Sequence, residues 1–144
     1  MIFSNRGEVS LYDLVLSGRK TQTRRPCKEG DYAYLGEETL QLASTLSDGK
    51  QVLSVYRAGR LKWRFGKWYA VQPGRGKPSG GLIHLSGIAY IAQAGSISHP
   101  DALAEGFASV EAFQAAWVVI YGEEALILPC WRLSWLPKRY RQKG

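Results

Sequence analysis

Cysteine, histidine and long apolar segments are scarce in this sequence of 144 residues. Its two cysteines, Cys27 and Cys130, form no C-x-x-C pair, and its two histidines, His84 and His99, share no recognisable ligand spacing with them. A structural zinc site needs about four such ligands at characteristic spacings. We therefore expect no structural metal, and nothing in the sequence indicates a cofactor.

No segment approaches the roughly 20 consecutive apolar residues that a membrane-spanning helix requires. The N-terminal segment MIFSNRGE also lacks the apolar stretch of a secretory signal peptide. These two absences favour a cytoplasmic protein without membrane association.

Acidic residues are also few, since 12 Asp and Glu stand against 19 Lys and Arg, which gives a formal net charge of +7. A basic protein favours polyanionic partners, because each cation that neutralises a phosphate releases a counterion. Four of the cations lie close to the C-terminus: Lys138, Arg139, Arg141 and Lys143. We predict one domain over residues 1–136 and a basic tail over residues 137–144, which is either a solvated terminus or an arm that contacts a phosphate backbone.

Three short helices are predicted from capping residues. Ser10 precedes an apolar stretch that Gly18 closes, residues 100–105 precede Gly106, and Ser109 begins a longer helix over residues 110–121. The longest of the three carries an apolar stripe that we expect to pack in the core, formed by Phe113, Trp117, Ile120 and Tyr121.

The segment between the first helix and residue 96 is typical of β-structure. Asp48-Gly49 predicts a hairpin turn between strands at residues 40–46 and 51–56, and Ala58-Gly59 predicts a second turn. Further strands are expected at residues 61–65, 68–71, 82–94 and 126–135. The fold class is therefore mainly β with short α-helices, that is, α+β, and the arrangement suggests a small, partly open β-barrel.

Basic and aromatic residues alternate between residues 62 and 77, as in surfaces that stack bases and contact phosphates. The same alternation arises in a half-buried strand with its rings inward, which we expect for most of these rings. The loop at residues 72–81 is rich in glycine and carries Arg75 and Lys77, which are candidate ligand-binding residues.

A polar and basic sequence, GRKTQTRR, occupies residues 18–25. It resembles the signature G-x-K-x-x-E-x-R of the ASCH domain, a member of the PUA-like superfamily of β-barrels. Gly18, Lys20 and Arg25 match this signature, and Thr23 stands where the family often has Glu. The resemblance covers most of the chain except residues 37–65 and the tail, and it implies a small PUA-like barrel that binds RNA.

The sequence GRKTQT is also similar to that of a bacterial branch of the family that hydrolyses 4-acetylcytidine. This resemblance implies that Lys20 is the general base, Thr23 the nucleophile and Glu105 the acid. The chemistry is coherent, because a hydroxyl attacks only when a base takes its proton, and burial or nearby cations can lower a lysine pKa enough for that role. Arg19, Arg24 and Arg25 are close enough in sequence to supply this cationic field, and they are candidate ligand-binding residues.

Two departures from that branch favour a larger ligand. Arg24 replaces an apolar residue after the nucleophile position, and the chain is longer by an insertion of β-structure. The predicted partner is therefore RNA or a modified, cytidine-like nucleoside. Three alternatives remain open at this stage: an amidohydrolase, a module that binds RNA or a modified base without turnover, and a ribonuclease.

Overall fold

The computed structural model describes residues 1–3, 5–6 and 9–136, and the predicted tail lies outside them. The strands in this part of the chain are β1 (Asn5–Arg6), β2 (Val9–Ser10), β3 (Gln22–Pro26), β4 (Tyr32–Tyr34), β5 (Leu40–Leu42), β6 (Ser54–Arg57), β7 (Arg60–Arg64), β8 (Trp68–Val71), β9 (Gly81–Ile91) and β10 (Cys130–Trp135). The helices are α1 (Leu11–Leu16), α2 (His99–Ala104) and α3 (Val110–Tyr121), with 3-10 turns at Ala43–Thr45 and Glu123–Ile127. This content confirms the predicted class, mainly β with short helices.

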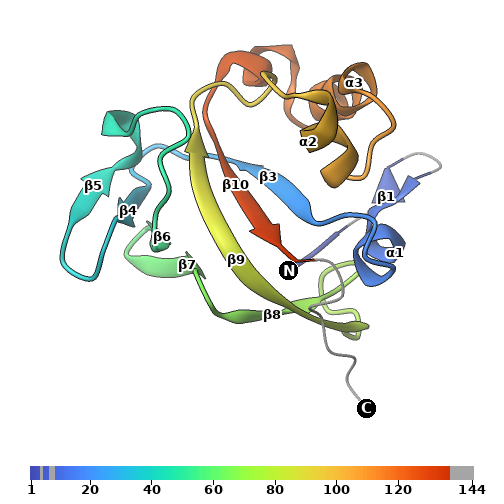
Figure 1. Cartoon of the computed structure of the whole chain (residues 1–144), viewed down its shortest axis with the longest axis horizontal. Coiled ribbons are helices and arrows are strands. Elements are labelled where there is room, and N and C mark those ends of the chain that lie inside the picture. The colour runs from blue at the N-terminus through green and yellow to red at the C-terminus, as the bar shows by residue number, and fades with distance from the viewer. Residues whose placement is uncertain (4, 7–8, 137–144) are drawn as a thin grey trace.

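Two antiparallel sheets form the body of the protein (Figure 1). The first has the order β3-β10-β9-β8 and the second, smaller one the order β5-β4-β6-β7. Residues 50–52 join them, because Gln51 bridges to Ala89 and the Val52 amide donates to the Ile88 carbonyl at 3.0 Å. The two sheets therefore curl around one core, in which Val55 and Trp63 of the smaller sheet pack with Trp131 and Leu133 of the larger one.

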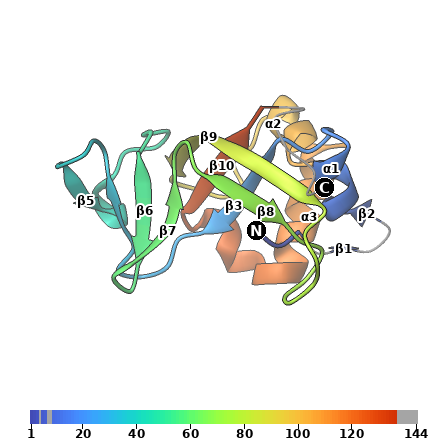
Figure 2. The same ribbon diagram turned by 90° about the horizontal axis from the view of Figure 1, so that it is seen from below.

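The helices gather at the opposite end of the molecule from the smaller sheet (Figures 1 and 2). Their caps follow the sequence prediction. The hydroxyls of Ser10 and Ser109 accept hydrogen bonds from the amides of Asp13 and Ala112, respectively. Gly122 ends α3 at a φ of 94°, in the left-handed region that glycine enters without steric cost.

The hairpin predicted around Asp48-Gly49 is wrong. The two predicted strands do not pair with each other, because β4 lies between β5 and β6 in the smaller sheet. Asp48 and Gly49 do form a turn, but this turn docks on β9, where Gly49 donates to the Tyr90 carbonyl and Asp48 accepts from the Ala92 amide. The turn itself is as predicted, but β5 and β6 each pair with β4, whose Ala33 is fully buried, and not with each other.

Three further expectations need correction. The last strand begins at Cys130, after a 3-10 turn and Pro129, and not at residue 126. In the stripe of α3, Phe113 and Trp117 are buried, but Tyr121 is 41% exposed because it lies at the last turn. Among the rings of residues 62–77, Trp63 is buried whereas Phe65 and Trp68 are exposed.

Candidate functional site

The site forms where the edge strand β3 meets the end of α2. The amide of Thr21 donates to the Ala104 carbonyl at 2.9 Å, which fixes the end of α2 beside the start of β3. Glu105, the C-cap of α2, then reaches the exposed edge of the strand, and its Oε1 accepts the Arg24 amide at 3.1 Å. This contact satisfies a backbone donor that an edge strand would otherwise leave free.

A cavity of about 320 Å³ opens at this junction. One wall is polar and is formed by Lys20, Thr23, Arg24, Arg25 and Glu105. The rest is apolar and mostly aromatic, formed by Ile2, Phe3, Leu11, Phe107, Phe113, Ala116, Trp117, Ile120 and Tyr121. A few converging polar groups in an apolar cavity are the usual composition of a small-molecule site.

Lys20 is almost completely buried, with 2% of its surface exposed. Its Nζ donates to the carbonyls of Gln22 at 2.7 Å and Glu105 at 2.6 Å, and it lies 3.8 Å from Glu105 Oε1. Desolvation lowers the pKa of Lys20 to about 8, against the opposing effect of the Glu105 carboxylate and with the help of Arg25. A lysine whose pKa lies this close to neutral pH can exchange a proton under physiological conditions.

Glu105 is also buried, and its two carboxylate oxygens differ. Oε1 accepts the Arg24 amide, whereas Oε2 has no hydrogen-bond partner in the described part of the chain. An unpaired buried carboxylate oxygen is costly, and such a group is usually satisfied by a water or a ligand. The site therefore offers a strong acceptor for a donor that enters the cavity.

Thr23 lies opposite Leu133 in the pairing of β3 with β10 and is 6% exposed. It lines the same cavity as Lys20 and Glu105, so the structure brings the three residues of the predicted constellation to one wall. Their catalytic roles remain a prediction.

Arg25 and Arg24 follow Thr23 on β3 but have different surroundings. Arg25 lines the cavity, donates to the Ile2 carbonyl at 2.7 Å and lies over the Phe3 ring at 5.4 Å. Burial lowers the pKa of its guanidinium, although arginine keeps its charge in proteins. Arg25 is thus a fixed positive charge in the cavity wall.

The Arg24 guanidinium is hydrogen-bonded to the loop that precedes α2. Its Nη1 donates to the carbonyls of Ala94 and Ser96, and its Nη2 lies 3.7 Å from Asp101 Oδ2. Its proposed contact with a ligand remains a prediction, and these bonds favour a structural role.

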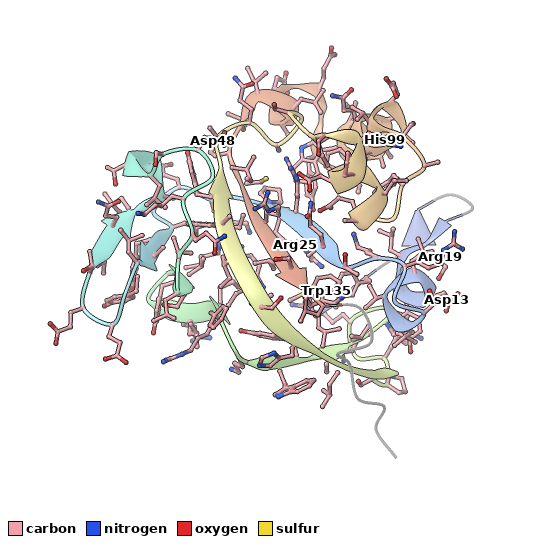
Figure 3. All side chains as sticks on the ribbon, in the orientation of Figure 1. Asp13, Arg19, Arg25, Asp48, His99 and Trp135 are labelled. Carbon is pink, nitrogen blue, oxygen red and sulfur yellow. The ribbon has the colours of Figure 1, made fainter. Side chains whose placement is uncertain are left out.

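The remaining predicted binding residues do not line the cavity. Arg19 is exposed beside Asp13 at the edge of the molecule, in a separate groove (Figure 3). Arg75 and Lys77 are exposed in the loop between β8 and β9. If these residues bind a ligand, they contact a part of it that extends beyond the cavity.

The sequence did not indicate that aromatic residues line a cavity. Phe3 is buried against Trp135 and held by the N-terminal segment, whose Phe3 amide donates to the Gln72 carbonyl. Phe107 packs edge-on against Phe113, and Tyr121 contacts Trp117 at 4.5 Å between ring centroids. The i, i+4 spacing of Phe113, Trp117 and Tyr121 was a usable signal, but that spacing is equally typical of a core-facing helix.

No group of three or more His, Cys, Asp or Glu side chains in the described residues is arranged to hold a metal ion. Burial raises the pKa of both thiols, to about 12 for Cys130, which makes them unsuitable as nucleophiles. None of the helices in the part of the chain that is described combines the length and hydrophobicity needed to cross a bilayer.

No family model matches the sequence, and no curated protein is significantly similar to it. A solved structure does match: that of protein EF3133 from Enterococcus faecalis V583, of family DUF984, with a TM-score of 0.51 and 16% sequence identity. The match covers 93% of this chain and 73% of that one. At this identity it shows a shared fold, and a fold by itself does not fix a function.

Proposed function

We propose that this protein is an ASCH-type, PUA-like domain whose cavity binds a cytidine-like nucleoside and hydrolyses the amide of its acylated exocyclic nitrogen. The observation that carries the proposal is the buried trio of Lys20, Thr23 and Glu105 on one wall of the cavity. The ASCH-like sequence at residues 18–25 and the barrel fold shared with a DUF984 protein support it.

The cavity suits a planar, polar base. The aromatic side chains of Phe3, Phe107 and Tyr121 provide surfaces for stacking. The free Oε2 of Glu105 is an acceptor for an exocyclic N–H, which is the contact by which carboxylates recognise cytosine N4. Arg25 supplies a positive charge near the acyl oxygen or the base carbonyl.

The first half of the reaction is acyl transfer. Thr23 Oγ1 attacks the acyl carbonyl carbon, and its proton passes to Lys20 Nζ. Neutral Lys20 has two N–H bonds, which the Gln22 and Glu105 carbonyls accept, so its lone pair faces the third direction. The tetrahedral intermediate collapses as the C–N4 bond breaks, and the proton held by Lys20 passes through Glu105 to N4, so that the amine leaves and Lys20 is neutral again.

The second half restores the enzyme. A water molecule gives a proton to Lys20 and attacks the acyl-Thr23 ester. The C–O bond to Thr23 Oγ1 then breaks as Lys20 returns this proton to the hydroxyl. The balanced outcome is one acylcytidine and one water converted to cytidine and a carboxylic acid. Every proton carrier in this scheme lines the cavity.

A reader that binds a modified base without turnover is the second candidate. It is favoured by one specific observation, the three acceptors around Lys20 Nζ, because two carbonyls and a carboxylate stabilise the charged ammonium. A charged Lys20 recognises a ligand but cannot act as a base.

Incubation with 4-acetylcytidine, followed by chromatographic detection of free cytidine, tests the enzyme proposal. Thr23→Val keeps the side-chain shape and deletes the hydroxyl, so turnover should be lost while ligand affinity changes by about 0.5–1.5 kcal/mol, the worth of one hydrogen bond. Thr21→Val is the matched control, because Thr21 does not line the cavity, and it should retain activity.

Two results would contradict the proposal in different ways. If the wild-type protein binds acylcytidines but releases no cytidine, the enzyme proposal is wrong and only the second candidate, binding of a modified base without turnover, remains. Full activity in Thr23→Val would keep the amidohydrolase and remove Thr23 as its nucleophile.

A further inference from the structure

Arg25 differs from the other cations of the cavity wall because it has no carboxylate partner in the described part of the chain. Lys20 pairs with Glu105 at 3.8 Å and Arg24 pairs with Asp101 at 3.7 Å, whereas no ion pair among the described residues includes Arg25. Its guanidinium is nevertheless shielded from water, and this desolvation lowers its pKa. A buried charge is costly unless an opposite charge and hydrogen bonds compensate it.

The contacts of Arg25 fix its guanidinium but do not neutralise it. Nη2 donates to the Ile2 carbonyl at 2.7 Å, and the guanidinium lies over the Phe3 ring at 5.4 Å. No other hydrogen bond joins the guanidinium to a described residue, so most of its N–H donors are left for a ligand. A planar guanidinium held in this way binds a carboxylate through two parallel hydrogen bonds.

The electrostatic surroundings of Arg25 also favour an anion. Tyr121 and Glu105 oppose the effect of desolvation on the Arg25 pKa, but neither forms an ion pair with it. Lys62 of β7 is a further cation nearby: desolvation lowers its pKa, and the charges of Arg57 and Arg25 lower it further. An anion bound to Arg25 would reduce this repulsion between like charges.

The position of Arg25 on β3 relates its charge to the proposed nucleophile. Thr23 and Arg25 are two residues apart on one strand and line the same cavity, so their side chains lie on one face about 7 Å apart. A short chain on the carbonyl carbon that Thr23 attacks would bring an anionic end to Arg25. A phosphate on the ribose is less well placed, because it lies at the opposite end of an acylated nucleoside.

On the basis of the proposed amidohydrolase, we propose that the acyl group removed in this cavity ends in a carboxylate, which pairs with the Arg25 guanidinium. The substrate class is the monoamide formed by a short dicarboxylic acid with the exocyclic nitrogen of a cytidine-like base. Hydrolysis breaks the C–N4 bond and consumes one water, and it yields the free amine of the base and a dicarboxylic acid. An acetyl group lacks the second carboxylate and leaves the charge of Arg25 unpaired.

The test varies the charge of the substrate while its shape stays the same. N4-succinylcytidine is compared with its terminal amide, which has the same size but no charge, and kcat/KM should be higher for the charged compound by about tenfold or more, as expected for hydrogen bonds to a charged group. 4-Acetylcytidine 5′-monophosphate places the charge on the ribose instead, and it should be no better a substrate than 4-acetylcytidine.

Substitution of Arg25 shows whether this residue is the source of the preference. Arg25→Gln should abolish the preference for the charged acyl group, and Arg25→Lys should restore part of it, because an ammonium keeps the charge without the guanidinium fork. The ratio of the two kcat/KM values is the readout, since a purely structural role would lower both values together. Lys50→Gln removes an exposed charge elsewhere and should leave the ratio unchanged.

Three results would overturn the proposal. They are equal kcat/KM for N4-succinylcytidine and its terminal amide, an undiminished preference in Arg25→Gln, and a gain from the 5′-phosphate as large as that from the succinyl carboxylate. The first and third need only the wild-type protein, so they decide the matter even if Arg25→Gln does not fold.

Failure of the proposed function gives a different result, because no acylcytidine is then hydrolysed. In that case isothermal titration calorimetry of the wild-type protein with N4-succinylcytidine and its terminal amide tests the pairing with Arg25 directly. Tighter binding of the charged compound by about tenfold supports the carboxylate site, and equal affinity overturns it.

Discussion

Lys20 is the residue on which the chemistry of the cavity depends, because opposing effects set its pKa. Burial lowers that pKa, Glu105 raises it through its charge and a hydrogen bond, and Arg25 lowers it further. The balance leaves the pKa at about 8, well below the ordinary value of 10.5. Both protonation states are therefore populated near neutral pH.

If Lys20 is the general base, kcat/KM for 4-acetylcytidine should rise with pH and level off above about 8, because only the neutral amine accepts the Thr23 proton. Initial rates between pH 6 and 9.5 measure this rise and plateau of kcat/KM. A flat profile over that range would exclude Lys20 as the base.

Direct titration of Lys20 tests the role of Glu105 without an assay of activity. Glu105→Gln keeps an acceptor for the Arg24 amide but removes the charge that raises the Lys20 pKa, so that pKa should fall below the wild-type value. The ¹³Cε chemical shift of Lys20 against pH reports the change. A pKa that stays the same or rises would show that Glu105 does not control the proton on Lys20.

Among the elements, the hairpin of β6 and β7 has a turn whose sequence does not match its geometry. Ala58 and Gly59 have φ angles of 53° and 76°, and two successive positive φ values are typical of a type I′ turn. Such turns favour Asn-Gly, because the left-handed conformation is costly for alanine. Both residues are exposed, so their effects should be purely conformational.

Ala58→Asn should therefore stabilise the protein by about 0.5–1 kcal/mol, and Gly59→Ala should destabilise it by about as much. A Cβ at Gly59 would meet no atom within 4 Å, so steric overlap does not contribute. Urea denaturation with an unchanged m-value measures both. A less stable Ala58→Asn together with a neutral Gly59→Ala would contradict this description of the turn.

At the scale of the whole molecule, a buried carboxylate joins the two sheets. Asp31, which precedes β4, accepts from Arg57 Nε at 2.9 Å and from the Trp131 indole of β10 at 3.0 Å. Desolvation alone would raise the pKa of Asp31, but hydrogen bonds from Arg57, the Lys28 amide and Trp131 outweigh it and hold the pKa below 3.8. The charged form is thus part of the native structure.

Asp31→Asn should lower the free energy of unfolding by about 1.5–3 kcal/mol, because hydrogen bonds to a charged group are lost. The depressed pKa means that the folded protein gives up this proton more readily than the unfolded chain. The stabilisation by Asp31 is therefore complete above the unfolded pKa and decreases as the pH falls through and below about 4.

Denaturation of wild type and Asp31→Asn at pH 7 and pH 3 measures this contribution, which should be smaller at the lower pH. Glu29→Gln removes an exposed carboxylate from the same turn and serves as the control. A constant difference between wild type and Asp31→Asn at both pH values would contradict the assignment.

Removal of residues 137–144 tests the predicted division into a domain and a basic tail. The melting temperature should not change, since the proposed domain ends at residue 136. If the tail contacts phosphates, truncation should also flatten the salt dependence of RNA binding, by up to about 3 in slope for its four cations. An unchanged slope would show that the tail is only a solvated terminus.

Local chemistry by itself determined much of the fold. The serine caps and the terminal glycines follow from hydrogen bonding and sterics within a few residues, and the structure agrees with them.

Only the tertiary structure decided how distant segments meet. Asp48-Gly49 has the chemistry of a hairpin turn, yet β4 lies between the two strands that were expected to pair, with both of its edges hydrogen-bonded. Glu105 lies 85 residues from Lys20, and the docking of α2 on the edge of β3 brought them together. Ile2 and Phe3 entered the cavity wall because the N-terminal segment pairs with Gln72. Such contacts depend on burial summed over the whole core, which no short sequence window contains.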